Sequence, residues 1–485
     1  MEPVGYVLPD VELEKLGPTR CLIASNRDGG LERGMYVKVG GGGRFYVSQV
    51  VDGPYYLEEG EGYRTVYTLD LALTVSGAFQ SAVLDRPAPK TPVYPLEEEA
   101  VQGFLGAVGD IAVGRLATQG SVRVGLDSAT LTRHVGIFGT TGSGKSNTIQ
   151  VMMEEASKAG FAVLVFDVEG EYVMMDQPTD RLQDLLEDFG LKPRGVDNLA
   201  VYTPHPCASR RGDAVRFGIP FKDVDKQVFS EVAGLNRMEQ LYFMDLIEKV
   251  EAIAPAFRKI TLQAVLERLK GRLEAQADNP TMPPYIAEAH TSLYSKLTAI
   301  QGLGVVDAPA KPVKIPDLLA AGKVSIVDFS DASDPVKNIV IADLLHKVFK
   351  YKIAHPDTPR LFIVLEEAHT FISREKRGEM MATLILLLEL ARRGRKRGIC
   401  LNIVTQQPAH LPPELLELCN TRIMHRMSST TNIQSLKEST GNVPEAFWDT
   451  LPSLSRGQAL IASPRYTQAI IAQVRPVMSK RLATE

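Results

Sequence analysis

The chain has 485 residues, of which 44% are hydrophobic and 23% charged, and its formal net charge is −4. This length accommodates two or three domains with buried cores, and the composition is ordinary for a soluble globular protein. The acidic balance excludes a protein that binds nucleic acid over its whole surface, so such binding needs a local basic patch, for example inside a ring.

The cysteines and the apolar runs exclude further classes of protein. Four cysteines occur, none in a C-x-x-C pair: Cys21, Cys207, Cys400 and Cys419. This spacing argues against a zinc site and a disulfide framework and fits a reducing cytoplasm. No basic segment followed by an apolar one begins the chain, so we expect no signal peptide, and the longest apolar block, 380–388, is too short to span a membrane. We expect a cytoplasmic protein with no membrane partner.

Residues 1–95 are predicted to form a small β-barrel or sandwich. Short runs such as 35–39 and 44–51 alternate with period 2 and are rich in β-branched and aromatic residues, with Gly, Asn and Asp turns between them. The four glycines at 40–43 predict a hairpin tip. The proline-rich stretch 86–92 indicates a linker.

Strand and helix patterns alternate in residues 96–220 and again in 311–485, which is typical of an α/β domain with a parallel sheet. Continuous apolar runs predict buried strands at 161–167, 324–329, 361–366 and 401–406. Each of these runs ends in polar residues. Because the carboxyl ends of parallel strands share one edge of a sheet, we expect the chemistry at that edge.

A phosphate-binding loop is predicted between an apolar run, 135–138, and a helical stretch that starts at Lys145. The loop fits the pattern G-x-x-x-x-G-K-[ST] at every fixed position. Its glycines let backbone N–H groups surround an anion, and the helix N-terminus adds a positive dipole. Lys145 is expected to reach the β- and γ-phosphates, and the Ser146 hydroxyl to help hold Mg²⁺. The predicted nucleotide-binding residues are Gly139, Thr140, Thr141, Gly142, Ser143, Gly144, Lys145, Ser146 and Asn147. No N-K-x-D motif is present, which favours ATP over GTP.

Two segments contain no motif that indicates a function. Between residues 221 and 310 the strand pattern disappears, and the amphipathic stretches 228–253 and 260–274 predict a helical insertion into the α/β domain. The basic tail 475–481 is expected either to reach a neighbouring subunit or to be frayed, as short termini usually are.

Polar side chains at the predicted strand ends are the candidate catalytic groups. Glu366 lies where a water-mediated contact to Mg²⁺ is needed, and Glu367 is placed to orient or activate the attacking water. Asp167 either positions water or metal beside the γ-phosphate or is an acid at the start of a loop that caps a helix. Gln406 can contact a γ-phosphate through its amide.

Residues 374–397 form a basic segment with eight positive and three negative side chains, a local charge of 8 − 3 = +5. Its basic residues are Arg374, Lys376, Arg377, Arg392, Arg393, Arg395, Lys396 and Arg397. Two functions suit them: contact with a nucleic-acid backbone, and an arginine finger inserted into a neighbour's active site. A solvated charged face is the alternative. Arg133, just before the run that leads to the phosphate loop, is another candidate for reaching a neighbour's nucleotide.

These motifs together resemble the HerA family, in the HerA/FtsK group of ring-forming DNA translocases. The resemblance rests on the blocks 133–146, 167–172, 366–369, 394–398 and 405–408 and spans essentially the whole chain. The N-terminal barrel is similar to the HAS-barrel of that family, and the helical insertion has a counterpart there. Two positions depart from the pattern: Glu366 where Asp is usual, and Gln407 where Arg is common.

The resemblance implies a RecA-like ATPase core and a homohexamer with double-stranded DNA in its central channel and ATP sites between subunits. It implies action within one subunit by Lys145, Ser146, Asp167, Glu366, Glu367 and Gln406. It implies action on a neighbour's nucleotide by Arg133 and one of Arg392, Arg393 or Arg395. It also implies a NurA-type nuclease partner on the barrel side. We therefore predict an ATP-driven DNA translocase or helicase in DNA end processing and recombinational repair.

Four alternatives stay open at this point. Related chains also scaffold a nuclease or sirtuin-like effector in antiphage defence. A conjugative type IV secretion-like ATPase has the same kind of ATPase core but usually works beside a membrane. A regulatory nucleotide switch is disfavoured by the missing N-K-x-D motif. A structural ring with secondary hydrolysis would differ from a motor in lacking DNA-stimulated turnover.

Overall fold

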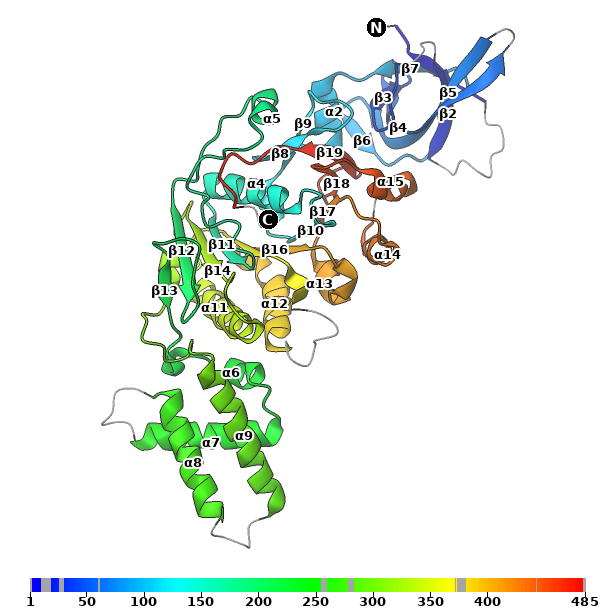
Figure 1. Ribbon diagram of the computed structural model, residues 1–485. Coiled ribbons are helices and arrows are strands. Elements are labelled where there is room, and N and C mark those ends of the chain that lie inside the picture. The colour runs from blue at the N-terminus through cyan, green and yellow to red at the C-terminus, as the bar shows by residue number, and fades with distance from the viewer. Residues whose placement is uncertain are drawn as a thin grey trace. The chain divides into compact units, whose positions relative to one another are not determined.

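The computed structural model describes residues 2–9, 19–25, 30–59, 62–253, 260–277, 283–370, 372, 381–441 and 443–482 (Figure 1). The chain divides into two compact units. The first comprises Met1–Leu131, Gly136–Thr148 and Asn420–Arg475, and the second comprises Thr132–Val135, Ile149–Cys419 and Pro476–Glu485. The phosphate loop therefore belongs to the first unit, and the acidic strand ends belong to the second.

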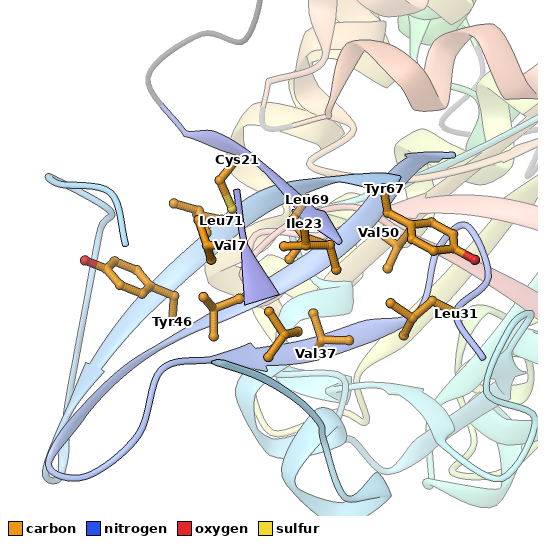
Figure 2. Packing of buried hydrophobic residues seen from close by; sticks show 12 residues of the cluster. Val7, Cys21, Ile23, Leu31, Val37, Tyr46, Val50, Tyr67, Leu69 and Leu71 are labelled. Carbon is orange, nitrogen blue, oxygen red and sulfur yellow. The ribbon is translucent and has the colours of Figure 1, made fainter. Parts of the chain in front are cut away.

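The first unit contains a closed β-barrel. Its strands follow the order β2 (Arg20–Ser25), β1 (Gly5–Val7), β7 (Pro92–Pro95), β3 (Tyr36–Val39), β4 (Arg44–Glu59) and β5 (Gly62–Ser76), with β6 (Phe79–Ser81) paired to β5. Pairing of β2 with β5 closes the ring of six strands. Figure 2 shows Val7, Ile23, Val37 and Leu69 packed in its interior. The predicted small N-terminal β-barrel is confirmed.

The proline-rich stretch 86–92, predicted to be a linker, belongs partly to the barrel. Its last residue, Pro92, begins β7, which pairs with both β1 and β3. Thr91 O accepts from Val7 N, so the barrel already includes the residue before the strand. The predicted linker is therefore wrong over these residues. A proline is tolerated here because it stands at the first position of a strand.

The first unit also carries half of the chain's larger sheet, in the order β10 (Val135–Phe138), β17 (Thr421–His425), β18 (Gln458–Ala462), β19 (Ile470–Val474), β8 (Ile111–Leu116) and β9 (Arg123–Leu126). From β17 to β9, each neighbouring pair is antiparallel. Its helices include α2 (Glu98–Leu105), α3 (Ser128–Leu131), α14 (Thr430–Ser439) and α15 (Glu445–Thr450).

The second unit contains six parallel strands in the order β13 (Val215–Phe217), β12 (Leu199–Pro204), β14 (Val324–Asp328), β11 (Ala162–Asp167), β15 (Leu361–Leu365) and β16 (Ile399–Thr405). Every residue of β11, β14, β15 and β16 is buried, as their continuous apolar sequences predict. The helices of this part are α5 (Gln183–Asp188), α10 (Ile315–Leu318), α11 (Asp334–Ala354), α12 (Met381–Arg393) and α13 (Pro413–Leu418). Helix α4 (Lys145–Lys158) begins in the first unit and ends in this one. The predicted α/β fold with a parallel sheet is confirmed.

The region predicted to be a helical insertion contains α6 (Lys226–Val232), α7 (Arg237–Ile253), α8 (Leu262–Ala277) and α9 (Pro284–Gly302) (Figure 1). The buried carboxylate of Glu239 on α7 accepts hydrogen bonds from Ser292 and Lys296 on α9. The helical insertion is confirmed, while the residue boundaries between the four predicted parts stay a prediction.

The C-terminal tail is held in place as far as Leu482. Glu154 on α4 accepts hydrogen bonds from the backbone N–H groups of Met478 and Ser479, and Leu482 N donates to Glu171 O. The prediction of a frayed tail is wrong over these residues, because a buried carboxylate binds their backbone. None of the helices in the described ranges combines the length and apolar character needed to cross a bilayer.

A polar network joins the barrel to the neighbouring sheet of the first unit. The Gln468 side-chain N–H₂ donates to Tyr36 Oη over 3.0 Å and to Gln49 Oε1 over 2.6 Å, and all three residues are buried. Buried polar groups of this kind cost free energy when one partner is removed.

Replacing the centre of this network is expected to destabilise the first unit. Gln468→Leu leaves Tyr36 and Gln49 without their partner, and the free energy of unfolding should fall by about 1–3 kcal/mol. Urea unfolding followed by circular dichroism measures the change. The matched control is Gln80→Leu, at an exposed position of β6. Equal stability of the two variants would contradict the structural importance of the network.

Candidate active site

The phosphate loop connects β10 to α4, so the predicted strand–loop–helix arrangement is present. Gly139 has φ +154°, and a Cβ built there would lie 2.7 Å from Ser143 Oγ, so this tight turn needs glycine. The side chain of Lys145 is buried, and its Nζ donates to Thr140 O over 3.1 Å. The ammonium group is thus held against the loop itself.

Residues far away in the sequence support the loop from within the same unit. Thr140 donates to Arg426 O through both its backbone N–H and its hydroxyl, each over 3.0 Å. Gly457 N donates to Ser143 O, also over 3.0 Å. The loop is therefore attached to the end of β17 and to the residue before β18.

Two predicted nucleotide ligands at the start of α4 have different surroundings. The side-chain amide of Asn147 donates to Arg475 O over 2.8 Å, so one of its N–H groups is used in a hydrogen bond within the protein. Ser146 is half-buried. The nucleotide-binding roles of both residues stay predictions.

Asp167 ends β11 and is fully buried. Its carboxylate accepts hydrogen bonds from the backbone N–H groups of Glu171 and Tyr172, over 3.1 and 2.9 Å. Of the two roles predicted from the sequence, this geometry is that of a cap, although it closes the turn 168–172 and not a helix. A role toward water or metal stays a prediction.

Glu366 follows β15 and is held by Tyr172. The tyrosine hydroxyl donates to Glu366 Oε1 over 2.5 Å, and both side chains are buried. The other oxygen, Oε2, is also buried, and no hydrogen-bond donor reaches it from the described part of the chain. One oxygen of this carboxyl group is thus oriented, and the other is open to a further positive partner.

Burial controls the protonation of these acids. It raises the pKa of Asp167 to about 7, and repulsion from Asp328 at the end of β14 adds to the effect. Burial also raises the pKa of Glu366 well above its usual range, and the charge of Asp167 contributes. Two acids that share a buried site without a cation favour their neutral forms.

Glu367 has an unusual backbone conformation. Its φ of +42° lies in the left-handed region, which is uncommon for a residue with a long side chain and is often found at functional sites. The Nδ1 atom of His369 lies 3.2 Å from Glu367 Oε2 and 3.0 Å from Thr405 Oγ1. His369 therefore links the turn after β15 to the end of β16. Gln406 is the next residue after β16, and it is half-buried.

His134 positions the segments that carry the predicted trans-acting arginines. Its Nδ1 accepts from Leu401 N over 3.0 Å, so its Nε2 carries the proton and donates to Ala391 O over 2.7 Å. Arg133 precedes this buried histidine, and Arg392 follows Ala391. The structure thus brings these two arginine-bearing segments of one unit together.

The other basic residues have varied environments. Arg393 forms an ion pair with Glu389, while Arg392, Arg395 and Lys396 are exposed. Which arginine acts in trans stays a prediction. Three basic residues of the predicted segment lie outside the described residues: Arg374, Lys376 and Arg377.

Three residues that organise the site had no role assigned from the sequence: Tyr172, His369 and His134. All three lie inside the blocks on which the family resemblance rests. Their position within these blocks is therefore the sequence signal that could have identified them. Their hydrogen-bond partners depend on which strands are neighbours in the sheet, and the sequence does not show that order.

Removing the hydroxyl that orients Glu366 is expected to impair nucleotide hydrolysis. Tyr172→Phe keeps the ring but frees Glu366 Oε1. If Glu366 holds Mg²⁺, as the sequence predicts, ATP turnover at limiting Mg²⁺ should fall about 10- to 100-fold, the range for groups that orient metal ligands. Steady-state hydrolysis as a function of Mg²⁺ concentration measures it. Tyr285→Phe, at an exposed position of α9, is the matched control. Unchanged Mg²⁺ dependence would show that Tyr172 does not act through Glu366.

The raised pKa of Asp167 predicts a pH-dependent stability. Because the folded carboxyl group keeps a proton that the unfolded one releases, its stabilisation is complete below pH 4 and is lost as the pH rises through about 7. The free energy of unfolding of the wild type, relative to Asp167→Asn, should fall by about 2–3 kcal/mol between pH 5 and pH 8. Urea unfolding without Mg²⁺ tests this, with Asp188→Asn at an exposed position of α5 as control. A difference that rises with pH would contradict the assignment.

Comparison with known proteins agrees with these features. The family described as "Helicase HerA, central domain" matches residues 111–348. The DNA double-strand break repair helicase HerA of Saccharolobus solfataricus is 25% identical over 384 residues, which cover 77% of this chain and 70% of that protein. A probable DNA double-strand break repair helicase HerA of Methanocaldococcus jannaschii is 23% identical, with 79% of this chain and 81% of that protein covered.

Solved structures support the fold. VirB4 of Thermoanaerobacter pseudethanolicus superposes with a TM-score of 0.53 at 18% identity, covering 76% of this chain and 96% of that one. The plasmid coupling protein TrwB, solved in complex with ADP and Mg²⁺, superposes with a TM-score of 0.52 at 15% identity, covering 79% and 93%. The phosphate loop, the acid-ended parallel strands and the matches to HerA proteins lead to one conclusion: the chain is similar to the HerA family and has the fold of P-loop ATPases.

Proposed function

We propose that this protein is an ATP-driven translocase or helicase that moves on double-stranded DNA as a homohexamer during the repair of DNA ends. The single observation that carries the proposal is a complete phosphate loop in a chain whose curated relatives are named DNA double-strand break repair helicases. The two acids that follow β15, Glu366 and Glu367, would hold Mg²⁺ and orient the attacking water in ATP hydrolysis.

The residues fit Mg²⁺ as a cofactor. Glu366 offers a buried carboxylate oxygen that has no hydrogen-bond donor among the described residues, and Ser146 offers a hydroxyl at the start of α4. Mg²⁺ takes one or two protein ligands and completes its shell with water and phosphate oxygens. Bound Mg²⁺ would neutralise charge on the phosphates.

Each proposed catalytic residue has a separate task in this mechanism. The N–H groups of the loop bind the phosphates, and Lys145 contacts the β- and γ-phosphates. Glu367 orients the attacking water, with His369 beside its carboxylate, and Gln406 contacts the γ-phosphate. Asp167 maintains the turn that presents Tyr172 to Glu366.

A neighbouring subunit completes the proposed site. Arg133 and one of Arg392, Arg393 or Arg395 would stabilise negative charge on the transferring phosphoryl group, a contribution of about 10³–10⁵ in turnover. What supports this is the contact of His134 with Ala391, which brings the two arginine-bearing segments together.

The basic groups near α12 support an anionic ligand. A cavity of about 430 Å³ is lined by the cationic side chains of Lys352, Arg360, Lys396 and Arg397 and contains no acid in its lining. Such a surface suits a phosphate backbone, whose binding weakens as salt rises.

A NurA-type nuclease on the barrel side is part of the same proposal. The barrel strands β4 and β5 carry exposed large apolar side chains: Tyr55, Tyr56, Leu57 and Tyr63. Exposed apolar groups gathered on one hairpin are typical of a protein–protein contact. These residues offer a place for a partner to bind outside the ATPase core.

The decisive experiment measures ATP hydrolysis with and without linear duplex DNA at low salt. DNA should stimulate the wild type, Lys145→Ala should abolish turnover, and Glu367→Gln should bind ATP but hydrolyse it about 10²- to 10⁴-fold more slowly. Glu414→Gln, exposed at the start of α13, is the matched control. Light scattering on the same samples measures the number of subunits.

Two results would contradict the proposal. Hydrolysis that is indifferent to DNA would favour a scaffold over a motor. Wild-type rates in Lys145→Ala or Glu367→Gln would show that the reaction takes place elsewhere.

A further inference from the structure

His425, the last residue of β17, is fully buried beneath the phosphate loop. Its Nδ1 lies 2.8 Å from Gln458 O, and its Nε2 lies 2.8 Å from Thr148 Oγ1. Because a carbonyl oxygen only accepts, Nδ1 carries the proton. In the neutral ring Nε2 is then an acceptor, and the Thr148 hydroxyl donates to it.

The same histidine contacts the first and last glycines of the loop motif. A Cβ built on Gly139 would lie 2.7 Å from His425 Cβ, and one built on Gly144, whose φ is +125°, would lie 3.2 Å from His425 Cε1. The residue therefore lies directly against both ends of the loop, where a larger side chain at either glycine would displace it.

The charge state of the ring agrees with this arrangement. Burial, with a smaller contribution from the positive charge of Lys145, lowers the pKa of His425 to about 4. At neutral pH the ring is uncharged, so the hydrogen bond from Thr148 to Nε2 is maintained.

We propose that His425 is a positioning residue for nucleotide binding: through Thr148 it fixes the first turn of α4 against β17, so that the N–H groups of the loop and Lys145 face the phosphates. This inference rests on the proposed role of the loop in binding nucleotide. His425 touches no phosphate itself. Its effect passes through Thr148 and the two glycines.

The test uses the full-length protein, with Mg²⁺–ADP and Mg²⁺–ATP as probes. His425→Asn keeps a donor for Gln458 but loses the acceptor for Thr148, whereas His425→Gln keeps an acceptor in that region. Thr148→Val removes the hydroxyl without changing the size of the side chain. Thr203→Val, a buried threonine of β12 in the other unit, is the matched control.

We expect His425→Asn and Thr148→Val each to weaken ADP binding about 5- to 50-fold, the range for one lost buried hydrogen bond. The KM for ATP should rise by a similar factor while kcat changes less than about two-fold, since binding and not chemistry is affected. His425→Gln should recover most of the affinity. The double variant His425→Asn with Thr148→Val should bind no more weakly than either single variant, because both remove the same interaction.

Additive losses in the double variant, or wild-type affinity in His425→Asn, would overturn the inference. If His425→Asn does not fold, His425→Gln and Thr148→Val decide the question: Gln must retain affinity and Val must lose it. Failure of the proposed function looks different. In that case the wild type does not bind ADP, or Lys145→Ala binds it equally well.

Discussion

The two hydrogen bonds that the Asp167 carboxylate accepts from the backbone of Glu171 and Tyr172 are the constraint on which the arrangement of the acidic strand ends in the second unit depends. They close a turn at the end of β11 and bring the Tyr172 hydroxyl to Glu366 at the end of β15. Backbone N–H groups inside a protein need an acceptor, and a buried carboxyl group needs donors. One acid of the pair thus satisfies the backbone, and the turn it makes orients the other acid.

The phosphate loop depends on the same kind of support in the first unit. Within the loop Ser143 N donates to Thr140 O, whereas Thr140 N donates to Arg426 O outside it. The end of β17 supplies the outside contacts: Arg426 O binds Thr140, and His425 binds Thr148. A neutral histidine suits this place, because a second positive charge beside Lys145 would be costly to bury.

The groups proposed to do the chemistry are thus separate from the groups that position them. The chemical groups form short motifs, such as Lys145 with Ser146 or Glu366 with Glu367. The positioning groups come from other parts of the chain, or they belong to a motif but contact a neighbouring strand. His369 is of the second kind, because its ring contacts both Glu367 and Thr405. Glu367 also adopts a left-handed backbone conformation, which the surrounding turn has to stabilise.

Local pattern was enough to predict the barrel, the buried parallel strands, the helical insertion and the strand–loop–helix context of Lys145. Period-2 alternation, continuous apolar runs and fixed motif spacing all act over a few residues, so they can be read from a sequence. The same reasoning failed for Pro92, which belongs to a barrel strand, and for the tail at Ser479, which a buried glutamate binds. In both cases a partner far away in the chain decided the conformation.

The sequence by itself determined the phosphate-loop motif and the acids at the strand ends. From these it predicted which residues bind phosphate and which act on water, because such roles follow from side-chain chemistry at a given spacing. Only the tertiary structure decided that Asp167 caps a turn, that Tyr172 orients Glu366, and that His425 lies beneath the loop. The last two of these facts depend on which strands are neighbours in a sheet. That order is set by the packing of whole elements, and no single segment of the sequence contains it.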